Sequence, residues 1–398
     1  MPKIKGTLEN PGLPIAIAIT PETVFVGSID DSPEGTKQYS FALMEKFIAD
    51  TADIASVIKK MEPFIALAND TQVISISKED DGRLAKVIMP NLTKIVDFVD
   101  IRNCAVFNEI DLPLLVDVGL APANNGFYIN QNQLLTSVNL PKLDELGATF
   151  GISNSPLLTE LNISLLRKAA GGVQIMYTAI TVINLPVLTD YGSQFTLEYN
   201  PELLTISLNA LVTSKSLNIS NNAKLTTINM TSLTGPNTDN ADSYYINNNP
   251  LLTNINWPSL TKLPSGIYIS NNDSLQTFNN PNAVGPTNSN GTLNFVGNAV
   301  ITSINLPFFG CYQAIIYDNP LLTHIRIGPF SILNIQSAYF TNNALDQASI
   351  DHLLSRAENT AFSNMQINLG GGTNATPSSA GLASKSALQA RGWTVTTN

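Results

Sequence analysis

A leucine-anchored unit recurs along most of this chain, and its period constrains the fold more than any single residue does. The unit is clearest at 251–260, which reads Leu-Leu-Thr-Asn-Ile-Asn-Trp-Pro-Ser-Leu. Self-similarity at such a period predicts a solenoid, in which each repeat packs on its neighbours. Successive units are 21 to 28 residues apart, and their anchors are Leu84, Phe107, Leu135, Leu158, Ile180, Leu203, Leu225, Leu252, Leu275, Ile301 and Leu322.

Each unit predicts a short, half-buried β-strand just after its anchor. Apolar residues stand three and five positions after the anchor with a polar residue between them, as in Ile255, Asn256 and Trp257. This alternation has the period of a strand and not of a helix. Proline often follows at position six, as at Pro113, and a residue without an N–H ends the strand there. An apolar residue at position eight then returns to the core.

A second short strand is expected before each anchor, as at 244–246 and 267–269, and asparagine pairs follow it at 221–222, 248–249 and 271–272. Asparagine tolerates left-handed backbone angles and bonds to nearby backbone, so these pairs predict tight corners. Stacked in register, they would also form ladders of side-chain amides. Each coil would therefore consist of two or three strands joined by corners.

The repeat is irregular at several points. Longer units predict inserted loops at 121–126, 235–243 and 281–291. After Leu275 the pattern degenerates, because Asn280 and Ala283 fill positions that are larger and apolar elsewhere, and this predicts a distorted coil.

The segment 248–263 (Asn-Asn-Pro-Leu-Leu-Thr-Asn-Ile-Asn-Trp-Pro-Ser-Leu-Thr-Lys-Leu) resembles the irregular leucine-rich repeats of receptor L-domain proteins, units that also occur in bacterial and phage surface proteins. The resemblance covers about 84–345. It implies a mainly β, right-handed leucine-rich-repeat-like solenoid of about eleven coils, with a parallel sheet along each side. It also implies binding and not catalysis.

Residues 1–60 do not follow the repeat and predict a small α+β module, with a strand at 23–28 and a helix over 41–60. This arrangement resembles the N-terminal segments of bacteriophage tail-fibre and virion-appendage proteins. The alternative is a hairpin and helix that only cap the solenoid. Residues 61–83, with clean alternation at 73–77, would form the first layer of the stack.

The C-terminal residues predict an α/β cap, because a solenoid exposes its last apolar layer and an unpaired sheet edge. The expected elements are a helix over 344–358, a strand at 365–369, a helix over 378–391 and a strand at 393–396. This tail resembles the C-terminal caps of phage and environmental bacterial repeat proteins. The predicted domains are 1–60, an anchoring module, 61–345, the solenoid, and 346–398, the cap.

Composition favours a thin aliphatic core under an uncharged polar surface, since 43% of residues are hydrophobic, 7% aromatic and 13% charged. The net charge of -10 and the lack of a basic cluster argue against nucleic acid and anionic membrane surfaces as partners. The start, 1–6, lacks the apolar core of a signal peptide, and no apolar segment is long enough to span a bilayer. We therefore expect no membrane insertion.

No catalytic residue, cofactor or metal is expected. His324 and His352 are the only histidines, which leaves no histidine cluster for zinc or for nucleophilic catalysis, and His324 is expected on the solvent side of its strand. The glycines at 370–372 lack the Lys-Ser/Thr pair of a phosphate-binding loop. The acidic runs at 79–81 and 239–242 lack the spacing of a calcium loop and are expected to be solvated.

Cys104 and Cys311 lie some nine coils apart in a stacked arrangement, which is too far for a disulfide, so buried thiols are expected. Scattered carboxylates could pair as in a glycosidase, but no signature of a polysaccharide depolymerase is visible.

The outward residues two and four positions after each anchor should line up along one side of the stack. Their hydroxyls and amides could bind a sugar or another protein, or they could only solvate the sheet and complete ladders. The inserted loops are a second place for recognition. The candidate binding residues are Tyr244, Tyr245, Asn254, Asn256, Asn229, Thr227, Asn184 and Asn305.

Together the resemblances imply a structural, non-enzymatic bacteriophage virion protein, either a tail fibre or a head or tail appendage. Residues 1–60 would attach it to other virion proteins, and the solenoid would bind a host surface glycan or protein. Since fibre proteins are frequently trimeric, a homo-oligomer joined through residues 1–60 is expected, with a trimer as one form. The alternatives are a bacterial leucine-rich-repeat adhesin at the cell surface, an interaction scaffold and, third, a polysaccharide depolymerase.

Overall fold

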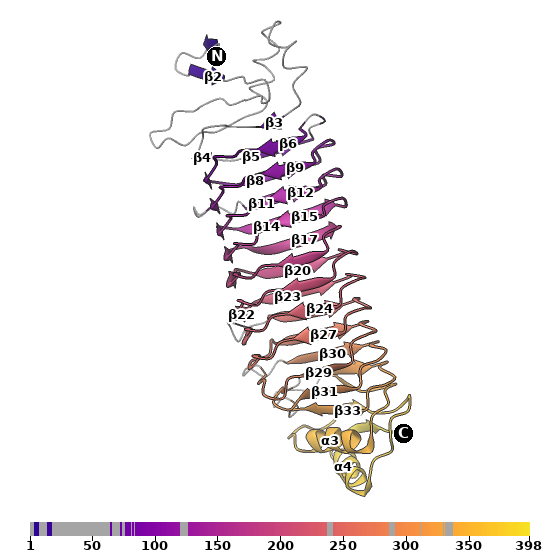
Figure 1. Ribbon diagram of the computed structural model, residues 1–398. Coiled ribbons are helices and arrows are strands. Elements are labelled where there is room, and N and C mark those ends of the chain that lie inside the picture. Colours follow the sequence, from indigo (N-terminus) through magenta and orange to yellow (C-terminus); the bar gives the residue numbers. More distant parts are fainter. Residues whose placement is uncertain are drawn as a thin grey trace. The chain divides into compact units, whose positions relative to one another are not determined.

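The computed structural model stacks short parallel strands from successive coils on one another, as the repeat predicts (Figure 1). It divides into two units, Met1–Gln194 and Phe195–Asn398, which together contain about ten turns of parallel β-solenoid. The predicted domain boundaries after residues 60 and 345 stay predictions. The structure describes residues 76–80, 82, 84–119, 126–236, 242–285, 291–310, 312–328, 330 and 337–398, and the backbone of strands at 4–7, 14–17, 64–65 and 72–73.

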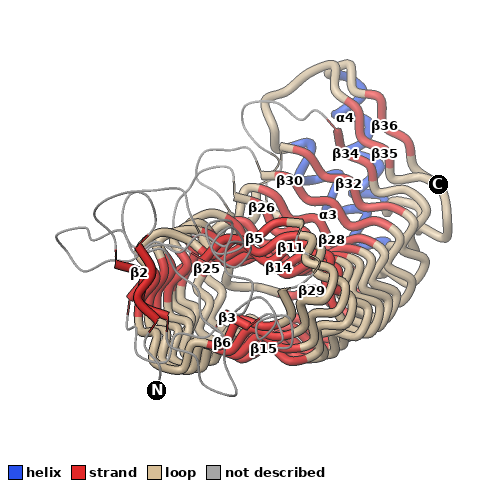
Figure 2. The backbone as a smooth tube through the Cα atoms, turned by 90° about the horizontal axis from the view of Figure 1, so that it is seen from above, coloured by secondary structure: helices blue, strands red, loops and turns tan. Residues whose placement is uncertain are grey.

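In the first unit, successive coils place one strand in each of three parallel sheets around the core (Figure 2). The front sheet contains β5 (Ile76–Glu79), β8 (Val99–Arg102), β11 (Phe127–Asn130), β14 (Thr149–Ser155) and β17 (Gly172–Thr178). The back sheet contains β3 (Phe64–Ile65), β6 (Lys86–Ile88), β9 (Glu109–Asp111), β12 (Ser137–Asn139) and β15 (Glu160–Asn162), and β18 (Val182–Asn184) is the next back strand along the chain. The side sheet contains β4 (Gln72–Val73), β7 (Lys94–Ile95), β10 (Asp117–Val118), β13 (Glu145–Leu146), β16 (Lys168–Ala169) and β19 (Asp190–Tyr191).

Near the N-terminus, β1 (Ile4–Thr7) pairs antiparallel with β2 (Pro14–Ile17), so that Ile4 lies opposite Ile17. The sequence analysis predicted neither of these strands. The strand predicted at 23–28 and the helix predicted over 41–60 lie outside the described residues.

The second unit repeats the front sheet with β20 (Gln194–Glu198), β23 (Ser216–Ser220), β26 (Ser243–Asn247), β28 (Gly266–Ser270), β30 (Thr292–Val296), β32 (Gln313–Tyr317), β34 (Ser337–Tyr339), β35 (Gln366–Asn368) and β36 (Thr394–Thr396). Its back strands fall into two sets. The first set is β21 (Thr205–Ser207), β24 (Thr227–Asn229) and β27 (Asn254–Asn256); the second is β29 (Thr277–Asn279), β31 (Ser303–Leu306) and β33 (His324–Ile327). Its side strands are β22 (Thr213–Ser214) and β25 (Gly235–Pro236).

The back strands do not form one continuous sheet: β15 and β18 belong to different sheets, and a second break falls between β27 and β29, at the coil of Leu275 where the repeat degenerates. The predicted alternation is clear in most other coils. In the coil of Phe107, for example, Ile110, Leu112 and Leu115 at positions three, five and eight are all fully buried. The core is therefore a stack of aliphatic and aromatic layers, one layer to each coil.

The asparagine corners form the predicted ladder. Asn248 has a φ of 56°, in the left-handed region, and the side chain of Asn249 turns into the core. The Asn249 Oδ1 accepts the backbone N–H of Asn222 at 3.1 Å, and its Nδ2 donates to the carbonyl of Ile219 at 2.9 Å. The same contacts repeat from coil to coil, so buried amides satisfy the backbone where the front strands end.

Two helices follow the last coils. The helix α3 (Gln347–Glu358) begins after Asp346, whose carboxylate accepts the N–H of Ser349 at 2.8 Å. The helix α4 (Ser379–Ala390) begins after Ser378. Both lie within the predicted ranges, and Ile350, Leu353 and Leu354 face inward as expected. In the described part of the chain, neither helix has the length and apolarity needed to cross a membrane.

Candidate functional site

The predicted polar array lies on the back sheet of the second unit. Thr227 pairs in register with Asn254, and Asn229 with Asn256. The Nδ2 of Asn256 donates to the Oδ1 of Asn229 at 3.2 Å, so these amides are engaged with each other in a ladder. The outward side chains of these two strands therefore present amides and hydroxyls along the stack.

The other predicted residues lie on other strands. Asn184 belongs to β18 of the first unit, and Asn305 belongs to β31, in the second set of back strands. Tyr245 lies on the front sheet, in β26. The inserted loops lie largely outside the described residues, at 120–125, 237–241 and 286–290.

The prediction of Tyr244 as a surface binding residue is wrong, because its side chain is only 1% exposed and is part of the core. Its hydroxyl bonds to the Ser214 Oγ, its ring meets Trp257 edge to face at 5.5 Å, and burial raises the pKa of its phenol. Tyr244 and Ile246 are two residues apart on one strand and therefore point to the same, inner face.

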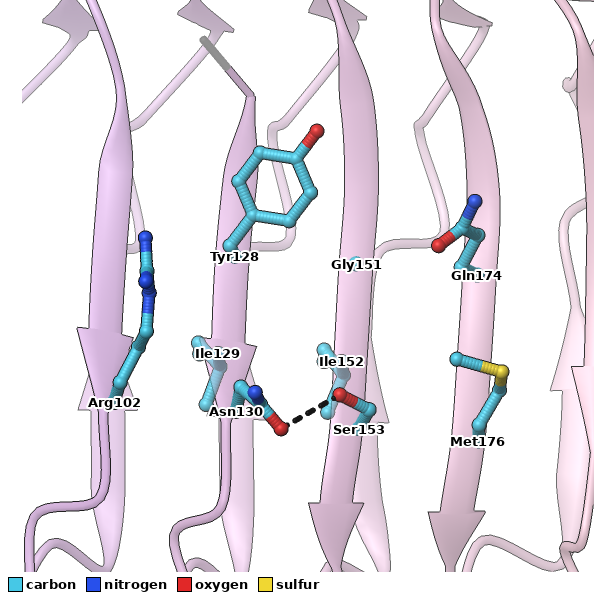
Figure 3. Close-up of a pocket in the computed structure, with 9 residues that line it drawn as sticks. All are labelled: Arg102, Tyr128, Ile129, Asn130, Gly151, Ile152, Ser153, Gln174 and Met176. Carbon is cyan, nitrogen blue, oxygen red and sulfur yellow. Dashed lines mark hydrogen bonds between the residues drawn. The ribbon is translucent and has the colours of Figure 1, made fainter.

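The outward face of the front sheet in the first unit carries a shallow pocket of about 280 Å³ (Figure 3). Four neighbouring strands, β8, β11, β14 and β17, line it. The side chains at its surface combine one aromatic ring, amides, a hydroxyl, a thioether and a guanidinium, and they are Arg102, Tyr128, Asn130, Ser153, Gln174 and Met176.

Glycine at position 151 makes room for the ring in this pocket. A Cβ on Gly151 would lie 2.8 Å from the Cδ1 of Tyr128, closer than atoms pack. The register explains the contact, because Tyr128 on β11 pairs with Gly151 on β14. The ring of Tyr128 therefore leans over the neighbouring strand instead of standing beside another side chain (Figure 3).

Polar contacts orient the remaining groups. The Arg102 Nε donates to the Asp100 Oδ1 at 2.6 Å, and this pairing raises the pKa of the guanidinium, which stays charged. The Ser153 Oγ donates to the Asn130 Oδ1 at 2.9 Å (Figure 3). The pocket thus offers fixed hydrogen-bonding groups beside the face of a ring.

The front sheet of the second unit also has outward aromatics. The rings of Tyr245 and Tyr268 on neighbouring strands stack at 4.5 Å between centroids, with an angle of 12° between their planes. Burial and the neighbouring Tyr245 raise the pKa of the Tyr268 phenol. Beside them, the Ser270 Oγ donates to the Asn294 Oδ1 at 3.3 Å.

Both histidines line one pocket of about 370 Å³ in the second unit, between the back strands and α3. His324 is exposed as expected, and its Nε2 lies 3.1 Å from the Asp346 Oδ2. The Nε2 of His352 lies 3.0 Å from the Ile327 carbonyl oxygen, and burial lowers the pKa of this imidazole. Sequence reasoning missed this convergence, because α3 brings His352 back to β33.

Groups for metal chemistry are not assembled: among the described residues, no three His, Cys, Asp or Glu side chains gather as metal ligands. Cys104 is buried as expected, and its thiol donates to the Arg102 carbonyl at 3.4 Å, whereas Cys311 lies outside the described residues.

No protein-family model, curated protein or solved structure matches this chain.

Proposed function

We propose that this protein is a non-enzymatic binding scaffold that recognises a surface glycan through the front sheet of its first unit. The observation that carries the proposal is the pocket in which Tyr128 lies over Gly151 between Arg102, Asn130 and Gln174. A ring face fits the C–H surface of a sugar, and amides and a guanidinium fit its hydroxyls. A few fixed polar groups beside an apolar contact are the usual content of a ligand site.

The mixed lining of this pocket suits a carbohydrate, which presents both an apolar C–H face and hydroxyls. The pocket is open and shallow, and Asn130, Ser153 and Gln174 present both donors and acceptors at its surface. Arg102 adds guanidinium donors whose charge is balanced by the Asp100 carboxylate. A ligand that lies flat across several strands would use all of these groups at once.

The proposed setting is a bacteriophage virion appendage, in which residues 1–60 attach to the particle and the solenoid contacts the host. This setting, like the right-handed leucine-rich-repeat geometry of about eleven coils, is supported by the sequence resemblances alone. The N-terminal resemblance concerns residues 23–60, which lie outside the described residues. A bacterial surface adhesin with the same binding face is the alternative. Mass spectrometry of purified phage particles separates the two, because detection only in bacterial cell fractions contradicts the virion setting.

Binding to an array of bacterial surface polysaccharides tests the proposed function directly. The wild-type protein should bind at least one glycan, and Tyr128→Ala should weaken that binding at least tenfold while leaving the melting temperature nearly unchanged. The matched control carries Thr227→Ala, Asn254→Ala and Asn256→Ala on the back sheet of the second unit, and it should bind like the wild type.

Two outcomes contradict the proposal. If the wild type binds no glycan, the ligand class is wrong. If the back-sheet variant loses binding while Tyr128→Ala keeps it, the predicted polar array is the site and the front pocket is not. A reducing-sugar assay on the bound glycan checks the depolymerase alternative, and release of reducing ends would contradict a purely binding role.

A further inference from the structure

The cavity that both histidines line, here called the back pocket, lies in the second unit and holds about 370 Å³. Residues of β29, β31 and β33 line it together with the first turns of α3, which packs beside β33 (Figure 1). Its volume is within the range of sites for small molecules. The polar lining residues that matter for its chemistry are Asn305, His324, Arg326, Asp346 and His352.

The carboxylate in the back pocket already has partners. The Asp346 Oδ2 lies 3.1 Å from the His324 Nε2, and the Asp346 Oδ1 accepts the N–H of Ser349 at 2.8 Å. The His324 Nδ1 lies 2.7 Å from the Thr323 Oγ1, so both nitrogens of this ring have partners as well. Asp346 therefore caps α3 and pairs with His324, and it repels an incoming anion less than an unpaired carboxylate does.

Arg326, by contrast, brings a positive charge that no carboxylate balances. Among the arginines that the structure describes, Arg102, Arg167 and Arg391 all donate hydrogen bonds within the chain. The guanidinium of Arg326 has neither a hydrogen-bond nor an ion-pair partner among the described residues. Asn305 pairs with it in register from β31, yet the buried Oδ1 of that amide also has no partner in the described part of the chain.

The helix α3 adds to the positive potential of the back pocket. Burial lowers the pKa of His352, and the nearby charges of Arg356 and Arg326 lower it further. Ala348 lines the pocket from the first turn of α3, where the helix dipole favours negative charge. Positive groups that gather in a cleft without a counter-charge attract anions. This local excess stands out in a chain whose net charge is -10.

We propose that the back pocket is a second binding site, which takes a small ligand carrying an oxyanion, either a phosphate or a carboxylate. The planar guanidinium of Arg326 holds the anionic oxygens, because its fork of N–H donors matches both groups. The volume leaves room beside the anion for a body of sugar size, which the amide of Asn305 can bond. This site lies in the second unit and does not depend on glycan binding by the front pocket.

Isothermal titration at low ionic strength tests the proposal with four probes: inorganic phosphate, glucose 6-phosphate, glucuronate and glucose. At least one of the two acidic sugars should bind at least tenfold more tightly than glucose, and the tighter of the two identifies the anion as phosphate or carboxylate. Arg326→Gln should weaken that binding at least tenfold. Arg167→Gln is the matched control, since it removes the same charge from an arginine already paired with Asp144 and Glu145.

Asn305→Asp is a second variant, which keeps the test decisive should Arg326→Gln fold poorly. It places a carboxylate beside Arg326 with almost no change in side-chain shape. The new carboxylate should pair with the guanidinium and occupy the place of the ligand's anion. Binding of the acidic sugar should fall at least tenfold, whereas the melting temperature should not fall.

Four results would overturn the proposal. Glucose may bind as tightly as both acidic sugars, which would remove the selection for an oxyanion. Equal losses in Arg326→Gln and Arg167→Gln would show that binding follows the overall charge and not this pocket. Wild-type affinity in Asn305→Asp would place the anion away from Arg326. Inorganic phosphate that binds as tightly as glucose 6-phosphate would leave no role for a sugar-sized body.

Discussion

The front and back sheets follow the same alternation of buried and outward residues, yet they use their outward positions differently. On the back sheet of the second unit, Asn229 and Asn256 bond to each other along the stack. On the front sheet of the first unit, Tyr128 leans over Gly151 and leaves a pocket. Small polar side chains that repeat from coil to coil complete the sheet, whereas a large ring beside a glycine breaks the repetition. Breaks in a regular scaffold are where recognition is expected.

The largest expected effect concerns a buried asparagine at the front corner. In Asn249→Ala, the Asn222 N–H and the Ile219 carbonyl lose their partners inside the core, because Asn249 bonds to both. Leaving two buried backbone groups unsatisfied should lower the free energy of unfolding by about 2–4 kcal/mol. Thermal and urea unfolding of the full chain measure this loss. A change below about 0.5 kcal/mol would contradict a structural role for the corner ladder.

The next largest effect is expected from a substitution that fills the front pocket. In Gly151→Val, the new Cβ falls 2.8 Å from the Tyr128 Cδ1, so the ring must rotate away and the added methyl groups occupy its place. Glycan binding on the array should fall at least tenfold, although the stability should change little because valine suits a strand better than glycine. Gly82→Ala is the control, since a Cβ there meets no atom within 4 Å. Wild-type affinity in Gly151→Val would exclude the front pocket as the site.

The repeat period made much of the fold predictable. A run such as Leu252, Ile255 and Trp257 places its residues at fixed positions of a coil, and the pairs at Asn248 and Asn249 mark its corners. The alternation along the front strands also predicts that Tyr244 points inward, because Ile246 two residues later is buried. Tyr244 was assigned to the surface because it was grouped with its outward neighbour Tyr245.

The candidate site was less predictable, because it depends on contacts between coils. The sequence places Tyr128 between two inward residues, and its outward direction follows from that alternation. Its contact with Gly151 requires the register of β11 against β14, which spacing alone does not supply. His352 likewise meets the back strands only after α3 has packed against them.

A smaller effect is expected at the corner of the second unit. Tyr199 has a φ of 54°, and Tyr199→Asn should relieve that strain and stabilise the protein by about 1 kcal/mol. Asn221→Ala, at the same corner one coil later, is the opposite case and should destabilise, because Asn221 has a φ of 59° and accepts a bond from Asn248. Differential scanning calorimetry measures both changes. Destabilisation by Tyr199→Asn would mean that the tyrosine contributes packing to the fold.

Stability and glycan binding should depend differently on pH. Burial lowers the pKa of His352 beside β33, so the unfolded chain binds a proton more readily than the folded one. Stability should therefore fall as the pH drops below about 6.5, the ordinary pKa of histidine, and level off below the folded value. His352→Gln should flatten this slope, and an unchanged slope would assign it to other groups. Glycan binding should change little over this range, because Arg102 stays charged.

The smallest effect is expected on the back sheet, where Asn256 lies in the same coil as Asn249 and can be compared with it directly. Asn256→Ala removes the hydrogen bond to the Asn229 Oδ1, but both residues are partly exposed, so water can replace the lost amide. The free energy of unfolding should change by less than about 0.5 kcal/mol, against the larger loss in Asn249→Ala, although each variant removes one asparagine amide. A loss above about 1 kcal/mol would show that the outer ladder also holds the coils together. Equal losses in the two variants would mean that burial does not distinguish the two ladders.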